Sequence, residues 1–142
     1  MALGHTIYRW CPKEGRASKL MSIPHDESLS SLKGNFDGTK LSLGYDTGLV
    51  KIFDIETQKI ERTMKGQEWR VGCMSWSKNE LSTGSRDKTI CIRDMRESKD
   101  YSLKLKGHKQ EVCGVAFSPC SRMLASGGND NLFFVWDTRK GH

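Results

Sequence analysis

The sequence has few of the features that mark enzymes, membrane proteins or secreted proteins. No stretch approaches the roughly 18 consecutive apolar residues that a membrane helix needs. The start, Met1–His5, lacks a basic segment followed by an apolar run, so no secretory signal is visible. A Gly-rich phosphate loop, a His-Glu-x-x-His motif and a nucleophile elbow are also missing. These absences predict a protein of the nucleus and cytoplasm that is no enzyme, binds no cofactor and has no membrane partner.

The cysteines lack the pairing typical of zinc sites. They are five in number and form no Cys-x-x-Cys pair: Cys11, Cys73, Cys91, Cys113 and Cys120. Zinc sites usually take their ligands in close pairs, because one turn must present two thiolates to one ion. We therefore expect reduced, mostly buried cysteines and no metal site.

Charge of one sign is not concentrated anywhere in the chain. The net charge of +6 arises from 23 basic and 17 acidic residues, and the densest basic stretch is only Lys104, Lys106 and Lys109. Nucleic-acid binders usually gather basic residues on one stripe, with aromatic residues between them. We predict a solvated surface and no nucleic-acid partner, and a mild preference for acidic partners stays open.

What the sequence does have is an internal repeat of about 40 residues, without any sustained helical period. Four similar strand ends close at positions 11, 54, 94 and 137: Tyr8-Arg9-Trp10-Cys11, Lys51-Ile52-Phe53-Asp54, Cys91-Ile92-Arg93-Asp94 and Phe134-Val135-Trp136-Asp137. This spacing is typical of a four-stranded propeller blade. The predicted fold class is all-β, a partial WD-repeat β-propeller of a little over three blades.

The repeat divides residues 1–142 into the end of a first blade (1–27), two full blades (28–65 and 66–106) and an incomplete fourth blade (107–142), with about thirteen strands. Propellers close with about four to eight blades, so an exposed blade face remains at each end of this arc. We expect a segment of a longer protein. Two copies completing one ring, or an arc that is stable alone, are the alternatives, and self-association through the open faces is a further expectation.

The last repeat resembles a WD repeat closely. His108, Ser126, Asp130 and Trp136 match the structural tetrad of that family, in which Asp accepts from His, His meets Ser, and Ser meets the Trp ring nitrogen. A closed network of this kind satisfies the polar groups of a buried turn without water. Because Ser126 lies inside an apolar strand, the trio of His, Ser and Asp predicts structure and not hydrolysis.

The two preceding repeats are eroded copies. In one, Gln67 replaces the His and Arg93 replaces the Trp. In the other, Thr47 stands at the Asp position, Phe53 stands at the Trp position, and the polar stretch 33–35 falls where an apolar strand is expected. We expect that second blade to be packed less tightly, since a missing large side chain leaves a void that costs roughly a few kcal/mol.

Several stretches are similar to one particular family of WD repeats. They are Arg70–Trp76, Leu81–Asp87, Gly107–Gly114 and Leu124–Asn131. They resemble the Fizzy and Fizzy-related activators of the anaphase-promoting ubiquitin ligase, strongly over 66–137 and more weakly over 3–65. Arg86-Asp87 with Arg93–Arg96 is more similar to the Fizzy-related branch.

The resemblance implies a non-catalytic module that recognises degrons of the KEN type in cell-cycle proteins for ubiquitin-dependent proteolysis. It places the KEN motif on the upper rim near the central channel, so Asn129 and Asn131 are the first candidate peptide-binding residues. Amides on a rigid turn can donate and accept, although Asn also favours left-handed turn geometry, and both interpretations stay open. Arg86, Asp87 and Thr47 occupy the matching turns of the preceding blades and are further candidates. An exposed Arg beside an Asp is often only a solvated pair.

The resemblance is incomplete. The family has a destruction-box groove between its first and last blades, an N-terminal C box and a C-terminal Ile-Arg tail, and this sequence shows none of them. We expect degron-bearing cell-cycle proteins and the anaphase-promoting complex as partners. A generic WD scaffold, or a truncated product with little binding activity, remains an alternative.

Overall fold

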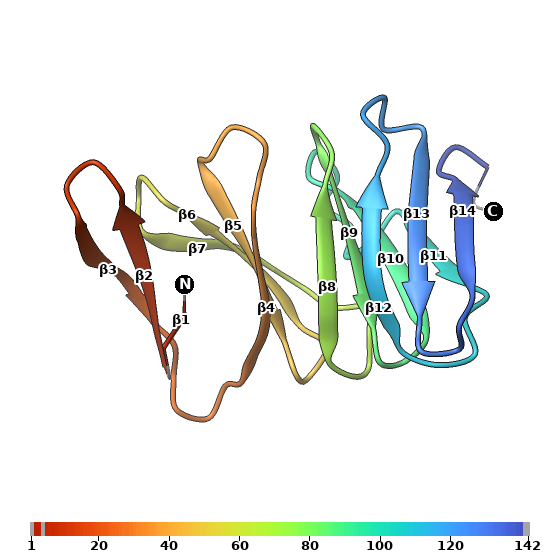
Figure 1. Cartoon of the computed structure of the whole chain (residues 1–142), viewed down its shortest axis with the longest axis horizontal. Helices are drawn as coiled ribbons and strands as arrows, with labels where there is room; N and C mark the ends of the chain where they lie inside the picture. The colour runs from red at the N-terminus through yellow and green to blue at the C-terminus, as the bar shows by residue number, and fades with distance from the viewer. Residues whose placement is uncertain (1, 4, 141–142) are drawn as a thin grey trace.

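The computed structural model describes residues 2–3 and 5–140, which form fourteen β-strands and no helix (Figure 1). The first sheet holds β1 (Ala2–Leu3), β2 (Thr6–Cys11) and β3 (Arg16–Ser22). The second holds β4 (Leu29–Gly34), β5 (Lys40–Tyr45), β6 (Val50–Asp54) and β7 (Lys59–Met64). The third holds β8 (Val71–Trp76), β9 (Glu80–Ser85), β10 (Thr89–Asp94) and β11 (Leu103–Lys106). The fourth holds β12 (Val112–Phe117), β13 (Met123–Gly128) and β14 (Phe133–Asp137).

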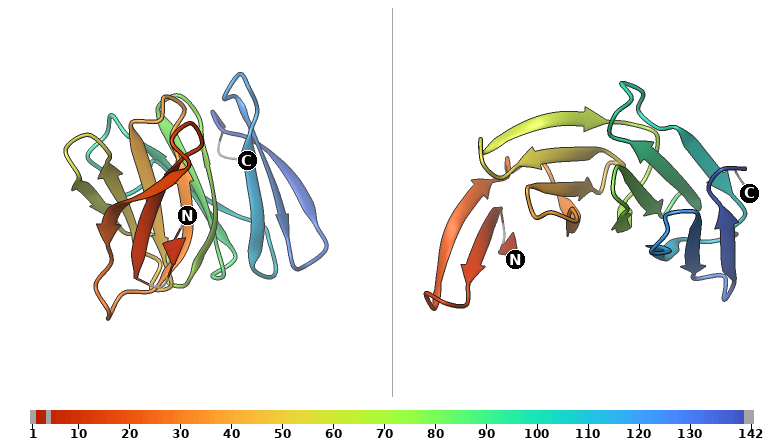
Figure 2. Two further views of the ribbon diagram at one scale, coloured as in Figure 1. Left: turned by 60° about the vertical axis from the view of Figure 1, so that its left-hand side comes forward. Right: turned by 90° about the horizontal axis from the view of Figure 1, so that it is seen from above.

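The four antiparallel sheets stand side by side around an open arc, which confirms the predicted all-β partial propeller (Figure 2). In each of the last three sheets the strands follow chain order, and β8 contacts both β4 and β12. The strands β7 and β11 lie on the convex side of the arc. The expected count of about thirteen strands was one short, because it omitted β1, a strand of two residues that pairs with Thr6 and Ile7.

The turn between the second and third strands has the same geometry in the last three sheets. One residue there adopts a positive φ: Gly48 at 85°, Lys88 at 72° and Asn131 at 60°. This left-handed conformation suits Gly and Asn and is unfavourable for Lys. The recurrence of the same backbone turn with three different residues shows that the blade and not the residue dictates the turn.

The first strand of each of these sheets contains a β-bulge near its start. The register shifts by one residue where β4, β8 and β12 pair with their neighbours, and the extra residue is Ser30, Gly72 and Cys113, respectively. A bulge bends the strand and fixes its register, so the same side chains face the core in every blade.

Glycines on the second strands let neighbouring sheets approach closely. A Cβ on Gly44 would lie 2.9 Å from Val71 Cγ1, and a Cβ on Gly84 would lie 2.7 Å from Val112 Cγ1. Both valines are fully buried. Gly127 stands at the same place on β13, and there a Cβ would meet only Phe133 Cδ2, at 3.9 Å.

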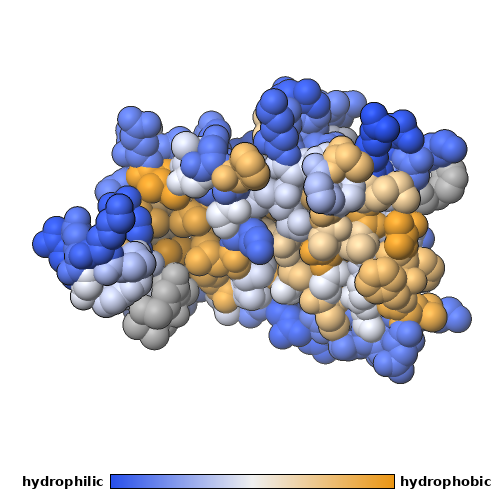
Figure 3. All heavy atoms as spheres, turned by 45° about the horizontal axis from the view of Figure 1, so that its top comes forward, coloured by the Kyte–Doolittle hydropathy of each residue, from blue (hydrophilic) through white to orange (hydrophobic). Residues whose placement is uncertain are grey.

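Hydrophobic surface gathers at the end of the arc formed by the fourth sheet, at the right of Figure 3. Phe133 is 71% exposed and Val135 is 57% exposed. Large apolar side chains exposed together are typical of a surface that contacts another protein surface.

The second sheet is not packed loosely, contrary to the expectation drawn from its sequence. Phe53 is 1% exposed and packs in one core with Leu43 and Tyr45, which are equally buried. The indole of Trp76, on the third sheet, donates a hydrogen bond to Ser42 Oγ at 3.0 Å. The expected loosening was wrong because side chains of the first sheet, such as Ile7, pack in the core of Phe53. Trp76 covers the opposite face of the second sheet.

Candidate functional site

The loops that enter the first strands and the turns that join the second and third strands meet at one edge of the arc, along the bottom of Figure 1. We call this edge the upper rim, the name used above for the expected peptide-binding edge, although Figure 1 is drawn with it at the bottom. Its segments are 46–48, 67–70, 86–88, 108–111 and 129–131. Backbone hydrogen bonds tie the segments together, for example from Arg86 N to Arg70 O at 2.9 Å and from Asn129 N to Glu111 O at 2.9 Å. Side chains on the rim are therefore presented from a fixed backbone.

Four side chains form a continuous hydrogen-bonded chain beneath the rim of the fourth sheet. His108 Nδ1 lies 3.0 Å from Asp130 Oδ2, and His108 Nε2 lies 2.8 Å from Ser126 Oγ. Trp136 Nε1 donates to the same Ser126 Oγ at 2.8 Å. Because the ionised Asp130 only accepts, His108 Nδ1–H donates to it; in that neutral tautomer Nε2 is the acceptor, and Ser126 donates to it. Ser126 is 1% exposed, so this network holds the turn in place and presents no hydroxyl to a substrate.

The carboxylate of Asp130 accepts hydrogen bonds from three neighbouring residues. Burial acts to raise the pKa of Asp130, but hydrogen bonds from the backbone N–H groups of Lys109 and Leu132 and from His108 lower it to about 2. Lys109 N donates at 2.6 Å and Leu132 N donates at 3.0 Å. The carboxylate therefore ties the loop that enters β12 to the turn between β13 and β14. The two candidate asparagines stand on either side of Asp130 in that turn.

Asn129 and Asn131 flank Asp130, and both side chains are exposed. Asn131 has a φ of 60° and donates its backbone N–H to Gly128 O at 3.2 Å, so it occupies the left-handed position of the turn. Asn129 has no positive φ, and its Oδ1 accepts from the thiol of Cys113 at 3.0 Å. Its amide NH₂ has no acceptor among the described residues. The two asparagines therefore differ in backbone conformation and in the partner of the side-chain oxygen, whereas the amide NH₂ of each has no acceptor among the described residues.

Asp87 and Arg86 occupy the matching turn of the third sheet and also differ. Asp87 accepts hydrogen bonds from Thr89 N at 2.9 Å and from Glu68 N at 3.0 Å, so its carboxylate anchors the rim as Asp130 does. The guanidinium of Arg86 is exposed and lies over the indole of Trp69, with 5.1 Å between the guanidinium carbon and the ring centre. Thr47 is exposed at the corresponding turn of the second sheet.

Arg70 connects the third and fourth sheets across the rim. Its guanidinium donates to Glu111 Oε1 at 2.7 Å and to Glu111 Oε2 at 3.0 Å, and these hydrogen bonds raise the pKa of Arg70. One hollow beside it is lined by Arg70, Glu111, Cys113 and Asn129, together with Ser30, Gly72 and Val112. A second hollow is lined by Asp46, Glu68, Trp69, Arg70 and Arg86.

Because Arg70 lines both hollows, they adjoin, and the structure brings Asn129 and Arg86 to one continuous stretch of rim. Asp87, Asn131 and Thr47 line neither hollow. Sequence reasoning missed Trp69, Arg70 and Glu111 as rim residues. One signal could have found two of them: Arg70 and Glu111 each stand directly before the first strand of a blade, β8 and β12.

Beneath the rim of the third sheet lies a network that replaces the tetrad. Thr83 Oγ1 donates to Gln67 Oε1 at 2.7 Å, and Gln67 Nε2 donates to Thr83 O at 3.0 Å. The guanidinium of Arg93 donates to Thr83 Oγ1 and, at 3.2 Å, to Lys65 O. Arg93 is 0% exposed, and burial lowers its pKa. Its Nε has no hydrogen-bond partner among the described residues.

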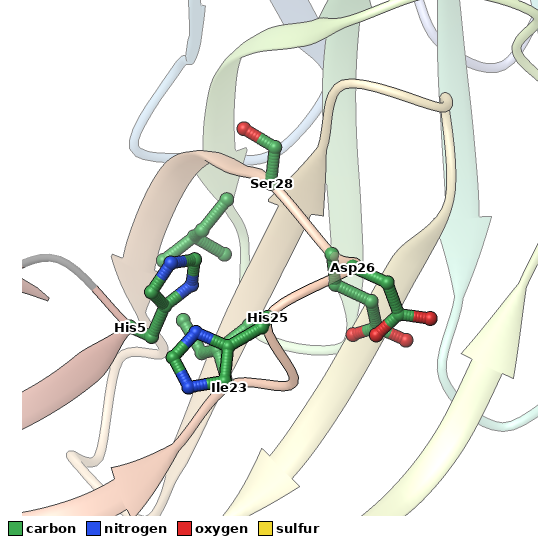
Figure 4. A pocket seen from close by; sticks show the side chains of 7 residues that line it. His5, Ile23, His25, Asp26 and Ser28 are labelled. Atoms are coloured by element: carbon green, nitrogen blue, oxygen red, sulfur yellow. The ribbon is translucent and has the colours of Figure 1, made fainter.

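A further hollow lies between the first two sheets (Figure 4). The rings of His5 and His25 meet edge to face there, with 4.5 Å between their centroids, and Asp26 and Ser28 complete the lining with neighbouring residues. His25 stands four positions before β4, as His108 stands before β12, but the facing turn carries Thr47 where the fourth sheet carries an Asp. Without that acceptor His25 stays exposed.

No group of three or more His, Cys, Asp or Glu side chains in the described part of the chain is placed to hold a metal ion. Residues 2–3 and 5–140 also contain no helix that is long and apolar enough to cross a membrane.

Comparison with known proteins identifies related propellers. Residues 99–137 match the family model of the WD domain, G-beta repeat, and residues 8–79 match that of the anaphase-promoting complex subunit 4 WD40 domain. The chain is 44% identical over 137 residues to Protein FIZZY-RELATED 1 of Arabidopsis thaliana, covering 96% of this chain and 29% of that protein. It is 42% identical over 139 residues to WD repeat-containing protein slp1 of Schizosaccharomyces pombe, covering 98% of this chain and 28% of that protein. The chain thus spans less than a third of these curated relatives.

Solved structures give the same result. A chain in the crystal structure of the mitotic checkpoint complex superposes with a TM-score of 0.91 at 40% identity, covering 97% of this chain and 42% of that chain. The WD40 repeats of RRP9 superpose with a TM-score of 0.75 at 21% identity, covering 83% of this chain and 38% of that one, which shows the shared fold alone.

Proposed function

Because this chain belongs to the Fizzy and Fizzy-related family of WD-repeat propellers, we propose that its upper rim binds short degron motifs of the KEN type in cell-cycle proteins. In this proposal the chain is a non-catalytic part of an activator of the anaphase-promoting complex, and it acts in the nucleus and cytoplasm. Binding would bring those proteins to the complex for ubiquitin-dependent proteolysis.

The observation that carries the proposal is the setting of Asn129. Its backbone is fixed by the hydrogen bond to Glu111 O at 2.9 Å, and its exposed amide keeps two N–H donors without a protein acceptor among the described residues. The thiol of Cys113, a weak donor, is the group that holds its Oδ1. An extended peptide has unpaired backbone and side-chain polar groups, and a rigid amide can both donate to and accept from them.

The neighbourhood of Asn129 suits a peptide that carries charges of both signs. Glu111 and Arg70 form an ion pair at 2.7 Å whose Arg70 side chain is 48% exposed. Such a partly solvated pair can exchange partners at low cost, because surface ion pairs contribute only about 0–1 kcal/mol. A lysine and a glutamate of a bound motif could each meet the opposite member.

The test is titration of a labelled peptide containing Lys-Glu-Asn with the purified chain, followed by fluorescence anisotropy. Asn129→Ala should weaken binding about tenfold, the value of one well-placed hydrogen bond to a charged or polar group. Asn131→Gly keeps the positive φ while removing the amide, so it separates turn geometry from contact. Asn79→Ala is the matched control, because Asn79 lies next to β9 at the opposite end of its sheet.

Equal binding of the Lys-Glu-Asn peptide and its Ala-Ala-Ala version would refute motif recognition. The exposed apolar face of the fourth sheet, with Phe133 and Val135, supports a second candidate function as a scaffold that joins apolar protein surfaces, a second copy included. Size-exclusion chromatography of the wild type and of Phe133→Ser tests that function. Loss of a larger species in the variant would favour it.

A further inference from the structure

We propose that Trp69 and Arg86 together form a subsite of the upper rim that receives one carboxylate side chain of the bound peptide, next to the segment held at Asn129. The inference rests on the proposed function in that it assumes a peptide on the rim. It adds a residue, Trp69, and a specificity, for an acidic position, that neither the family resemblance nor the candidate residues contain.

The loop that carries Trp69 is fixed although its side chain is 53% exposed. The carbonyl of Trp69 accepts from Ser85 Oγ at 2.9 Å, and its neighbour Glu68 donates its N–H to Asp87 at 3.0 Å. A Cβ on Gly48 would lie 2.2 Å from Gln67 O and 3.1 Å from Trp69 O, so the turn of the second sheet packs directly on this loop. Large aromatic side chains exposed from a rigid backbone are the residues that most often dominate binding energy at interfaces.

Arg86 is oriented by Trp69 and lacks an anionic partner. Its guanidinium carbon lies 5.1 Å from the centre of the indole ring, in a cation–π arrangement that favours this position of the side chain. No ion pair or side-chain hydrogen bond of Arg86 occurs among the described residues. Arg70, by contrast, already donates to both oxygens of Glu111. Arg86 is therefore the one of these two whose guanidinium donors are open without the loss of an existing ion pair, and a guanidinium can pair with a carboxylate through two parallel hydrogen bonds.

The other side chains of the hollow restrict the ligand further. Asp46 and Glu68 line it beside Trp69, Arg70 and Arg86. These carboxylates repel a multiply charged ligand such as a phosphate cluster more strongly than a single carboxylate, whose charge Arg86 can offset while apolar atoms of its peptide lie on the indole. The hollow thus favours a single acidic residue with an apolar stem or neighbour.

The subsite also lies where a peptide on Asn129 would pass. The hollow of Trp69 and Arg86 adjoins the hollow of Asn129 because Arg70 lines both. An extended chain advances about 3.3 Å per residue, so a few residues beyond the motif suffice to reach an adjoining hollow. The acidic residue should therefore flank the motif and not belong to it.

The experiment uses the 142-residue chain and pairs of labelled Lys-Glu-Asn peptides in serine-glycine context. Each pair carries one additional glutamate or glutamine, placed at a single position in the three to six residues on either side of the motif. At one position the glutamate peptide should bind the wild type about tenfold more tightly than the glutamine peptide. Arg86→Gln should abolish the preference, and Trp69→Ala should reduce it by about threefold or more.

Two further variants test whether Arg86 and Trp69 change the glutamate preference only by disturbing the structure. Arg86→Glu should reverse the preference, so that lysine binds better than glutamate at that position. Trp10→Ala should leave the preference unchanged, because Trp10 is 55% exposed, much as Trp69 is, but stands on β2 in the first sheet. The indole N–H signal that disappears in Trp69→Ala should shift in the ¹⁵N spectrum of the wild type on addition of the glutamate peptide.

The outcomes separate this inference from the proposed function. If no flanking glutamate is preferred while Asn129→Ala still weakens binding, the subsite is refuted and motif recognition stands. If a glutamate preference that depends on Arg86 persists when Lys-Glu-Asn is replaced by Ala-Ala-Ala, the subsite stands and motif recognition fails. A preference that survives Arg86→Gln refutes the subsite as well.

Discussion

In the third blade a buried arginine fills the place that a tryptophan fills in the fourth. In both blades a hydroxyl at the centre, from Thr83 or Ser126, accepts from that large side chain and bonds to a side chain of the entering loop. The pattern of donors and acceptors is the same, although the residues differ. The blade therefore requires a connected network at this point and tolerates different chemical groups within it.

The two blades differ in electrical charge and in their surroundings. The third blade buries the cation of Arg93 at 0% exposure with neutral oxygen partners, whereas the fourth blade pairs a histidine with the carboxylate of Asp130. The third sheet is covered by β4 on one side and by β12 on the other, through their contacts with β8. The fourth sheet exposes Phe133 and Val135. We expect the third blade to be the more rigid and the fourth to respond more strongly to pH.

The largest effect should come from Trp136→Ala. It removes an indole that is 7% exposed and leaves Ser126 without its donor, so the free energy of unfolding should fall by about 3–5 kcal/mol. Urea denaturation followed by circular dichroism measures it. Trp136→Phe keeps most of the packing and should cost about 1–2 kcal/mol. Equal costs for the two variants would show that the hydrogen bond, and not the packing, dominates in this blade.

Substitution of Arg93 should separate packing from charge in the third blade. Arg93→Ala should lower the free energy of unfolding by about 3 kcal/mol, because it leaves a cavity beneath the rim. Arg93→Met keeps the length and removes a buried cation whose Nε has no partner, so it should lie within about 1 kcal/mol of the wild type. A severe loss in Arg93→Met, in the same urea titration, would mean that the guanidinium network itself stabilises the blade.

Alanine at two equivalent glycines should show how differently the third and fourth blades are buried. A Cβ on Gly84 would come within 2.5 Å of Cys73 Sγ and 2.7 Å of Val112 Cγ1, so Gly84→Ala should cost about 1–3 kcal/mol. Gly127→Ala should change the stability by less than about 0.5 kcal/mol, because its Cβ would meet only Phe133 at 3.9 Å. Thermal unfolding of both variants provides the measurement. Similar losses would show that both glycines act through backbone conformation instead of contact.

The smallest effect should be a loss of local stability around Asp130 that appears only at low pH. The pKa of Asp130 falls from its usual 3.8 to about 2 in the folded chain, so its contribution is present above 3.8 and is lost as pH falls toward 2. The loss should be local, and it is measured as faster amide exchange of Lys109 and Leu132, the donors to Asp130. In Asp130→Asn this pH dependence should disappear. Its persistence in that variant would assign it to another group.

The fold could be predicted from the sequence because the repeat is local. Each blade is built from hairpins of consecutive strands, so the strand ends at Asp54, Asp94 and Asp137 and the turns between strands were legible from short stretches. Asp130 and Trp136 could be predicted as tetrad residues for the same reason. The tetrad positions need no knowledge of how the sheets pack.

Contacts between blades could not be predicted in this way. The bond from Trp76 to Ser42 and the ion pair of Arg70 with Glu111 join residues 34 and 41 positions apart, on different sheets. These contacts depend on the register and the angle between neighbouring sheets, and the sequence of one repeat carries no information about either. The second blade was expected to be loose for this reason: the sequence showed that Phe53 is smaller than Trp, but not which neighbours fill the space.

The bulge that recurs at Ser30, Gly72 and Cys113 has a consequence for folding kinetics. In a hairpin of regular strands, a slip of one residue carries every apolar side chain to the opposite face, and such slipped pairings compete with the native one. An extra residue at a fixed place makes the slipped pairings geometrically different from the native one, so each hairpin can select its register before it meets another sheet. Folding should therefore begin with independent hairpins of short loop closure, and neighbouring sheets should then dock against one another along the arc.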